Sequence, residues 1–114
     1  MLTLPIKKKW FDMILSGEKK EEYREITPYY ETRFKNLWKG SLIGGLEERK
    51  IMFRNGYSKN SPSFIAKCSA KIGTGNPKWG AEEGKLYYIL EIHEICLSER
   101  LKDLKEESDE LLRL

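Results

Sequence analysis

The sequence predicts an α+β fold with a small mixed or antiparallel sheet, and three observations support this. Apolar alternation and helical spacing give the order β-α-β-α-β-β-β-α, without a regular βαβ repeat. The chain has 114 residues, which suits one core, since domains of roughly 100 to 150 residues are the commonest size. With 39% hydrophobic and 34% charged residues, the composition is typical of a globular domain. We therefore expect residues 1–114 to form a single domain.

The N-terminal segment predicts a strand, a short helix and a second strand. Residues 2–6 alternate apolar leucine and isoleucine with threonine and proline, as a strand near a sheet edge does. Residues 8–16 place their apolar side chains at helical spacing, and Gly17 can cap that helix. Residues 20–26 alternate again and predict the second strand.

A second helix is predicted next. Thr27 can cap it and Pro28 can start it, since proline suits the first helical position. The apolar spacing reaches about Lys39, and Gly40 should end the helix. The glycine-rich residues 40–48 give no clear pattern and are left unassigned.

The middle of the chain predicts a hairpin followed by a long loop. Residues 49–54 and 64–72 have strand character, and residues 55–62 between them consist of turn-forming types. Residues 73–84 are rich in glycine and form a loop that carries Trp79. Loops of this length are often functional.

Residues 85–96 are the clearest strand. Even-numbered apolar residues share one face, and Tyr87, Ile89 and Ile95 largely share the other, so a central strand is expected. Residues 98–113 carry leucines at helical spacing and predict a C-terminal helix, which is core, a partner contact or the interface of a homodimer.

Charge is segregated along the chain. Seven basic residues and no acidic residue lie between positions 49 and 78, interleaved with aromatic side chains. Lysine and arginine contact phosphates and aromatic rings stack on bases, so this stretch predicts a surface for single-stranded nucleic acid. Alternatively, these lysines only solubilise the outer faces of strands. The aromatic residues are Phe53, Tyr57, Phe64 and Trp79.

Several functional classes are not expected. No apolar run approaches the roughly 20 residues that cross a bilayer, and the lysines at 7–9 follow the first apolar residues, unlike those of a signal peptide. Cys68 and Cys96 lie in apolar runs, which suits free thiols in the cytoplasm. With one histidine and no paired Cys or His spacing, we expect no metal site and no cofactor.

The most informative motif is G-x-K-x-x-E-x-R, formed by Gly17, Lys19, Glu22 and Arg24 at the end of the first helix and the start of a strand. Side chains two apart on a strand share a face, so Glu22 and Arg24 can form a charged pair. Lys19 and Arg24 could hold an anionic or carbonyl group while Glu22 accepts from a base amide. The alternative is an ion-pair network that only closes one end of the fold.

Residues 4–19, from Leu-Pro-Ile-Lys through the motif lysine, resemble the opening of ASCH domains. The segments 53–57 (Phe-Arg-Asn-Gly-Tyr) and 79–82 (Trp-Gly-Ala-Glu) resemble those of short, single-domain bacterial or phage members, so the resemblance covers most of residues 1–95. It implies a PUA-like, partly open β-barrel of about five to six strands with helices packed around it. It also implies a cleft beside the first helix into which the motif points.

The resemblance implies binding of RNA, a modified nucleoside or a nucleotide, with no membrane. Trp79, in its glycine-rich loop, suits stacking on a ligand ring, whereas Trp10 is expected to be a core anchor because it shares a helix face with Ile14. The expected ligand-binding residues are Lys19, Glu22, Arg24, Arg54, Tyr57 and Trp79.

Two enzymatic readings come from the same resemblance. Some ASCH-family proteins are amidohydrolases acting on N4-acetylcytidine, with a proposed threonine nucleophile three residues after the motif lysine. Here that residue is Glu22, so this activity is not expected. Others are described as ribonucleases, and a metal-independent ribonuclease using Lys19, Arg24, Arg54 and Tyr57 is the alternative to a binding module.

Overall fold

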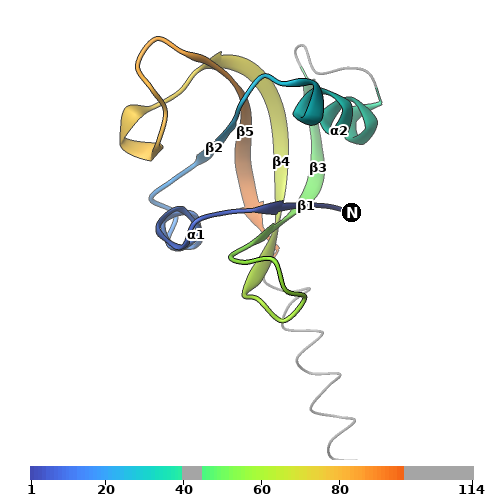
Figure 1. Cartoon of the computed structure of the whole chain (residues 1–114), viewed down its shortest axis with the longest axis vertical. Helices are drawn as coiled ribbons and strands as arrows, with labels where there is room; N and C mark the ends of the chain where they lie inside the picture. The colour runs from blue at the N-terminus through green and yellow to red at the C-terminus, as the bar shows by residue number, and fades with distance from the viewer. Residues whose placement is uncertain (40–44, 97–114) are drawn as a thin grey trace, which may run out of the picture.

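The computed structural model describes residues 1–39 and 45–96 (Figure 1). The predicted helix over 98–113 lies outside these residues, as does Gly40. Every strand and helix predicted before residue 97 is present, with a short 3-10 helix added in the long loop. The elements are β1 (Leu2–Pro5), α1 (Lys8–Leu15), β2 (Glu21–Arg24), α2 (Pro28–Trp38), β3 (Gly45–Arg54), β4 (Ser63–Thr74), η1 (Pro77–Trp79) and β5 (Leu86–Ile95).

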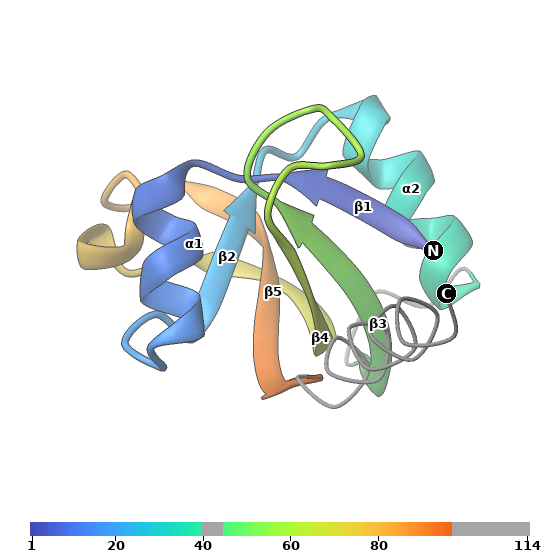
Figure 2. The same ribbon diagram turned by 90° about the horizontal axis from the view of Figure 1, so that it is seen from below.

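The described strands form one five-stranded sheet in the order β1-β3-β4-β5-β2. β1 pairs with β3 in parallel, and the other neighbours are antiparallel, so the sheet is mixed, one of the two predicted alternatives. The sheet curls into a half-barrel, with α1 and α2 on opposite sides of it (Figures 1 and 2). An α+β fold with a partly open barrel is therefore confirmed.

The core is enclosed by this curl. α1 contributes Phe11 and Ile14, and α2 contributes Phe34 and Trp38. Every one of these four side chains is at least nine-tenths buried, and burying each such side chain is worth about 1.5 to 3 kcal/mol. The remaining core residues are Leu4, Ile6, Ile51, Phe53, Phe64, Ala66, Cys68, Ala70, Tyr88 and Leu90.

The second helix begins as predicted but ends one residue early. The Thr27 side chain accepts a hydrogen bond from the amide of Tyr30, and Pro28 is the first helical residue. The end was predicted at Gly40, but Lys39 itself adopts the left-handed conformation, with φ 51°. Its amide donates to the carbonyl of Lys35, which satisfies one of the last helical acceptors.

β5 has a neighbour on each side, as the prediction of a central strand requires. The prediction that Ile95 faces away from Leu90 is wrong, because Ile95 packs against the main core. Lys67 pairs with Glu94 whereas the next residue of β4 pairs with Ile92, so β5 carries one extra residue there. Such a bulge reverses the alternation of faces.

Two strand boundaries differ from the sequence prediction. β3 begins at Gly45, within the segment left unassigned, and its register shifts between Gly45 and Arg49. This irregularity and the glycines hide the alternation on which strand prediction depends. The second strand ends at Arg24 rather than at residue 26.

A second, smaller cluster fixes the loop between β4 and β5. Tyr87 and Ile89 of β5 pack with Ala81 of the loop and with Tyr23 of β2. The loop approaches closely: a Cβ atom added at Gly75 would lie 2.7 Å from the Tyr23 ring and 2.7 Å from the Ala81 methyl carbon. The backbone of the loop is therefore packed tightly against the sheet.

We predict that Gly75→Ala destabilises the protein by about 1 to 3 kcal/mol, because the added methyl group overpacks this contact. Gly73→Ala is the matched control, since its Cβ would lie 3.4 Å from the nearest atom of Ile89 and its change should be below about 1 kcal/mol. Urea denaturation of both variants measures the difference. Equal free energies of unfolding for the two variants would show that the loop backbone shifts to accommodate the added methyl group without cost.

Candidate functional site

The candidate site lies where the turn between α1 and β2 meets loop 75–85. α1 ends at Leu15, and Gly17 adopts φ 84°, a left-handed conformation that costs glycine little, as its predicted capping role requires. The amide of Lys19 donates to the carbonyl of Met13 at 2.9 Å and closes the turn against the helix. This turn directs the Lys19 side chain into the interior, where only 1% of it is exposed.

The buried Lys19 ammonium is surrounded by partners. Its Nζ donates to the backbone carbonyl of Trp79 and lies 3.1 Å from Oε1 of Glu22. It also lies 4.4 Å from the ring centre of Trp10 and 5.1 Å from that of Tyr23. Burial lowers the pKa of Lys19 in spite of the opposing attraction of Glu22. The ammonium therefore ties loop 75–85 to α1 and β2.

Arg24 connects the two edge strands of the sheet. From β2, its Nη2 donates to Oε2 of Glu22 at 2.8 Å and to the carbonyl of Pro5, at the end of β1, at 2.7 Å. Its Nη1 donates to the hydroxyl of Tyr30 at 3.2 Å, whereas its buried Nε has no partner among the described residues. The predicted Glu22–Arg24 pair is thus present, and Lys19 joins it through the other carboxylate oxygen.

A cleft of about 280 Å³ opens beside this network. Its aromatic walls come from four elements, with Trp10 on α1, Tyr23 on β2, Tyr30 on α2 and Trp79 on η1. The charged pair of Glu22 and Arg24 lies at its wall, whereas Lys19 lies behind the aromatic rings. The further lining residues are Pro5, Ile6, Lys7, Glu25 and Gly80.

Trp79 is held in place through the backbone around it. The amide of Asn76 donates to the Tyr23 hydroxyl at 2.8 Å, and the carbonyl of Trp79 accepts from Lys19. Gly80, with φ 102°, lies so close to Trp10 that an added Cβ would be 2.9 Å from its ring. The half-buried Trp79 also borders a second hollow of about 500 Å³ on the far side of the loop.

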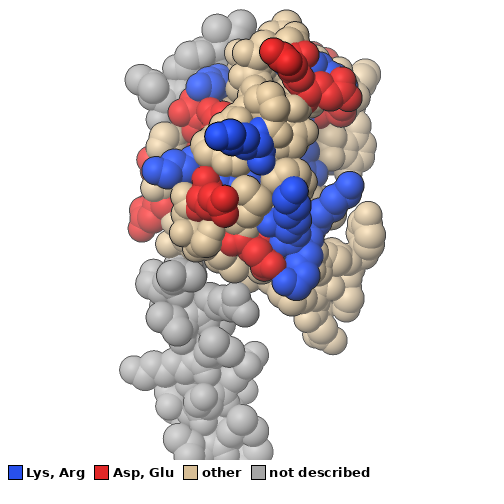
Figure 3. All heavy atoms as spheres, turned by 90° about the vertical axis from the view of Figure 1, so that its left-hand side faces the viewer, with Lys and Arg blue, Asp and Glu red and all other residues tan. Residues whose placement is uncertain are grey.

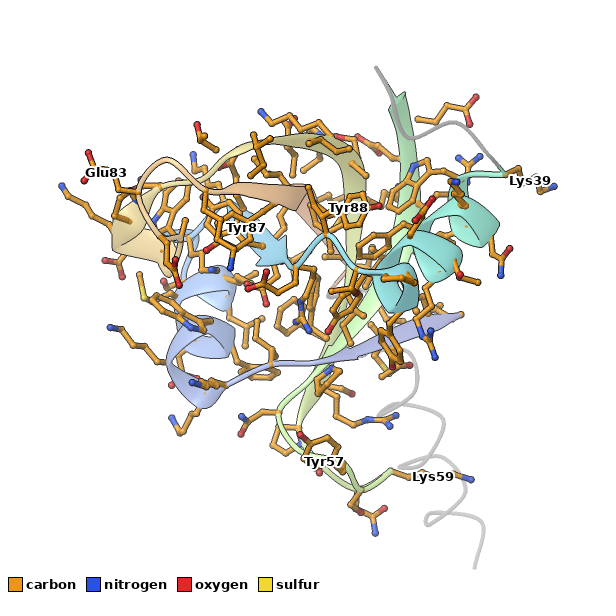
Figure 4. All side chains as sticks on the ribbon, turned by 45° about the horizontal axis from the view of Figure 1, so that its top comes forward. Lys39, Tyr57, Lys59, Glu83, Tyr87 and Tyr88 are labelled. Atoms are coloured by element: carbon orange, nitrogen blue, oxygen red, sulfur yellow. The ribbon has the colours of Figure 1, made fainter. Side chains whose placement is uncertain are left out.

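Of the six predicted ligand-binding residues, Glu22, Arg24 and Trp79 line the cleft, and Lys19 is buried behind it in contact with Glu22 and Trp79. Arg54 and Tyr57 lie apart from this group. Arg54 ends β3, and its Nη2 lies 3.6 Å from the sulfur of Met52. Tyr57 lies on the turn over residues 55–62, where 92% of it is exposed (Figure 4). Neither side chain lines the cleft around Arg24.

Sequence reasoning missed three of the four aromatic residues that line the cleft, Trp10, Tyr23 and Tyr30. Trp10 was expected to be a core anchor, but it is half-buried, packs against the core and also lines the cleft. The spacing from Trp10 to Ile14 indicates only a shared helix face. The role of Tyr30 was not predicted, because its hydroxyl meets Arg24 only in the folded chain. The cluster of aromatic residues around position 30 is the one hint in the sequence.

The acid-free stretch from residue 49 to residue 78 does not form an acid-free surface. Lys67 lies 3.3 Å from Glu94, and Lys71 contacts both Glu21 and Glu91. Two of its aromatic residues, Phe53 and Phe64, are buried in the core and cannot stack on a ligand. Basic side chains instead gather where α1 begins, on the face shown in Figure 3, where residues 7–9 are exposed lysines.

The comparisons with known proteins give no identification. The chain matches no protein-family model, no curated protein and no solved structure. Over residues 1–39 and 45–96, the structure gathers no group of three or more His, Cys, Asp or Glu side chains that could hold a metal ion. Neither α1 nor α2, the α-helices in that part of the chain, is long and apolar enough to cross a membrane.

We predict that Glu22→Gln lowers the free energy of unfolding by about 3 to 5 kcal/mol, because Lys19 and Arg24 lose the carboxylate between them in a buried setting. The melting temperature should fall by more than about 10 °C. Glu94→Gln breaks an exposed pair with Lys67 and should cost less than about 1 kcal/mol. Similar melting temperatures for the two variants would show that burial of Glu22 carries no such cost.

The lowered pKa of Lys19 predicts a pH dependence. Above the lowered folded pKa and up to the ordinary value of 10.5, the unfolded chain binds more protons than the folded one, so stability rises with pH. Lys19→Met has no titrating group at this position. The free energy of unfolding of the parent, relative to that of the variant, should therefore increase between pH 7 and pH 10. Urea denaturation of both proteins across this pH range measures the difference in their free energies of unfolding. A difference that does not change with pH would contradict the prediction. Tyr23, whose raised pKa acts in the opposite direction, is common to both proteins.

Proposed function

We propose that the chain binds a nucleoside or nucleotide, free or within single-stranded RNA, in the cleft around Arg24. The observation that carries the proposal is that four aromatic side chains, Trp10, Tyr23, Tyr30 and Trp79, line one cleft together with Arg24. Aromatic side chains stack on any base, and arginine donates to phosphate or carbonyl oxygens. A volume of about 280 Å³ suits a small planar ligand rather than a large one.

The polar groups of the cleft suit a base that both accepts and donates hydrogen bonds. Arg24 has a buried Nε without a partner among the described residues, and an unsatisfied buried donor costs about 1 to 3 kcal/mol. An acceptor on a ligand would relieve that cost. Glu25 and Lys7 also line the cleft and are exposed, so they can meet donors and phosphate groups at its mouth.

The family assignment is part of the proposal. The half-barrel and the position of the G-x-K-x-x-E-x-R motif between α1 and β2 are what an ASCH domain of the PUA-like class would have. These features support membership but do not separate it from other small half-barrels.

A binding role fits the geometry better than either enzymatic reading. Both Glu22 oxygens have charged partners, Lys19 and Arg24, so this carboxylate is not a free nucleophile in place of a threonine. The groups invoked for a ribonuclease do not share one cleft, because Lys19 is buried and Arg54 and Tyr57 lie outside it. We therefore place binding first and catalysis second.

We predict that Trp79→Ala weakens nucleoside binding by about 1 to 3 kcal/mol, which is fivefold to over a hundredfold in Kd, because one stacking wall is lost. The backbone carbonyl that holds Lys19 is kept, so folding should be retained. Tyr57→Ala is the control, since Tyr57 lies outside the cleft and should leave nucleoside binding unchanged. Calorimetric titration with the four common ribonucleosides measures the effect.

Absence of binding for all four ribonucleosides and for single-stranded RNA at low salt would refute the proposed function. Equal weakening by both variants would place the ligand elsewhere on the molecule.

A further inference from the structure

The turn over residues 55–62 is seated on the same short backbone segment that forms one wall of the cleft. The Asn55 side chain donates to the carbonyl of Ile6 at 2.9 Å, and the amide of Ile6 donates to the carbonyl of Arg54 at 2.9 Å. Ile6 and its neighbour Pro5 both line the cleft. The end of β1 therefore has the cleft on one side and this turn on the other.

Internal hydrogen bonds hold the turn in one conformation. Asn55 donates through its amide to the carbonyl of Pro62 at 2.8 Å, and Ser61 donates to the carbonyl of Ser58 at 3.0 Å. Gly56 has φ 126°, and an added Cβ there would collide with the side chain of Ser61. The backbone on either side of Tyr57 is therefore fixed.

This ordered turn presents an aromatic ring to solvent. Tyr57 is 92% exposed, more than any other large hydrophobic side chain among the described residues. It projects from the end of the hairpin, away from Tyr87 and Tyr88 of β5 (Figure 4). An aromatic ring held on a fixed turn gives a flat surface on which a base can stack at little entropic cost.

Positive charge is present both at the cleft and on the turn. Lys7, which lines the cleft, directly follows Ile6, and the exposed Lys8 and Lys9 come next, of which Lys8 pairs with Asp12. Lys59, on the turn itself, is also exposed. α1 has no acidic residue in its first turn, so its N-terminal end adds to the positive field rather than being neutralised.

The path along the backbone from the cleft wall at Ile6 to Tyr57 is short. One strand spacing of about 4.8 Å separates Ile6 from Asn55, and two residues of at most about 3.8 Å each lead from there to Tyr57. Tyr57 therefore lies within about 12 Å of the cleft wall along the backbone. A flexible nucleic-acid strand whose base occupies the cleft would reach it with a neighbouring nucleotide.

We propose that Tyr57 is a second stacking subsite, which receives a base neighbouring the one held in the cleft, while Lys7 contacts the phosphate between them. This inference rests on the proposed function and narrows its ligand to an oligonucleotide rather than a free nucleoside. Tyr57 and the cleft then act as two separated platforms on one single strand, joined by the lysines at the start of α1.

The test compares uridine, the dinucleotide UpU and hexauridylate as ligands of the parent, Tyr57→Ala and Tyr57→Phe proteins. Tyr57→Ala should weaken hexauridylate binding at least fivefold and leave uridine binding unchanged, because only the second base is lost. Tyr57→Phe should bind as the parent does, because the ring is retained. The melting temperature should not change, since the Tyr57 side chain is almost fully exposed.

The phosphate contact is tested by the salt dependence of hexauridylate binding. Lys7→Ala should lower the slope of log affinity against log salt by about 0.7, the value of one phosphate contact on a single strand. Lys35→Ala removes the same charge from α2, where Lys35 pairs with Glu31, and should leave the slope unchanged. Equal slopes for the two variants would remove Lys7 from the proposal.

The outcomes separate this inference from the proposed function. If Trp79→Ala weakens binding of uridine and hexauridylate whereas Tyr57→Ala weakens neither, the second subsite is wrong and the cleft stands. If Tyr57→Ala weakens uridine binding as well, Tyr57 belongs to the primary site and the inference is wrong. If no variant changes binding, or none of the three ligands binds, both proposals fail together.

Discussion

The buried row of charges formed by Lys19, Glu22 and Arg24 is the constraint on which the rest of this structure depends. The sheet has two free edges, β1 and β2, and Arg24 joins them by donating to the carbonyl of Pro5. At the other end of the row, Lys19 holds the carbonyl of Trp79 and so fixes the loop between β4 and β5. Together with the packing of the loop against Tyr23, these contacts bring both edges and the loop together around one cleft.

Burial explains how the three charges divide their roles. Removing an ion from water costs several kcal/mol unless partners surround it, and Lys19 meets that requirement with a carboxylate, a carbonyl and two aromatic rings. Such a group is already fully engaged and acts by positioning its neighbours. Arg24 differs because it lines the cleft and keeps an unpartnered Nε among the described residues. The motif therefore combines a structural ion pair with one residue able to meet a ligand.

The structure shows why counting charged residues along the sequence does not locate a basic surface. A stretch without acids is not a basic surface once β2 and β5 place Glu21, Glu91 and Glu94 opposite its lysines. The lysines that start α1 are fewer, but among the residues described only Lys8 of the three has a carboxylate partner, Asp12. Lys7 lines the cleft, and a short basic cluster that begins at a cleft is better placed to meet a ligand than a long run of lysines spread over a sheet and paired with acids.

The sequence by itself determined the order of the elements up to β5, the cap of α2 at Thr27, the hairpin and the face shared by Glu22 and Arg24, because these depend on local periodicity and backbone preference. It could not determine the bulge that turns Ile95 inward, since that arises from pairing with β4. Nor could it place Tyr30 and Trp10 in the cleft or Tyr57 outside it. The curl of the sheet decides these positions. It brings together residues that are distant along the chain, and it separates residues that belong to the same sequence pattern.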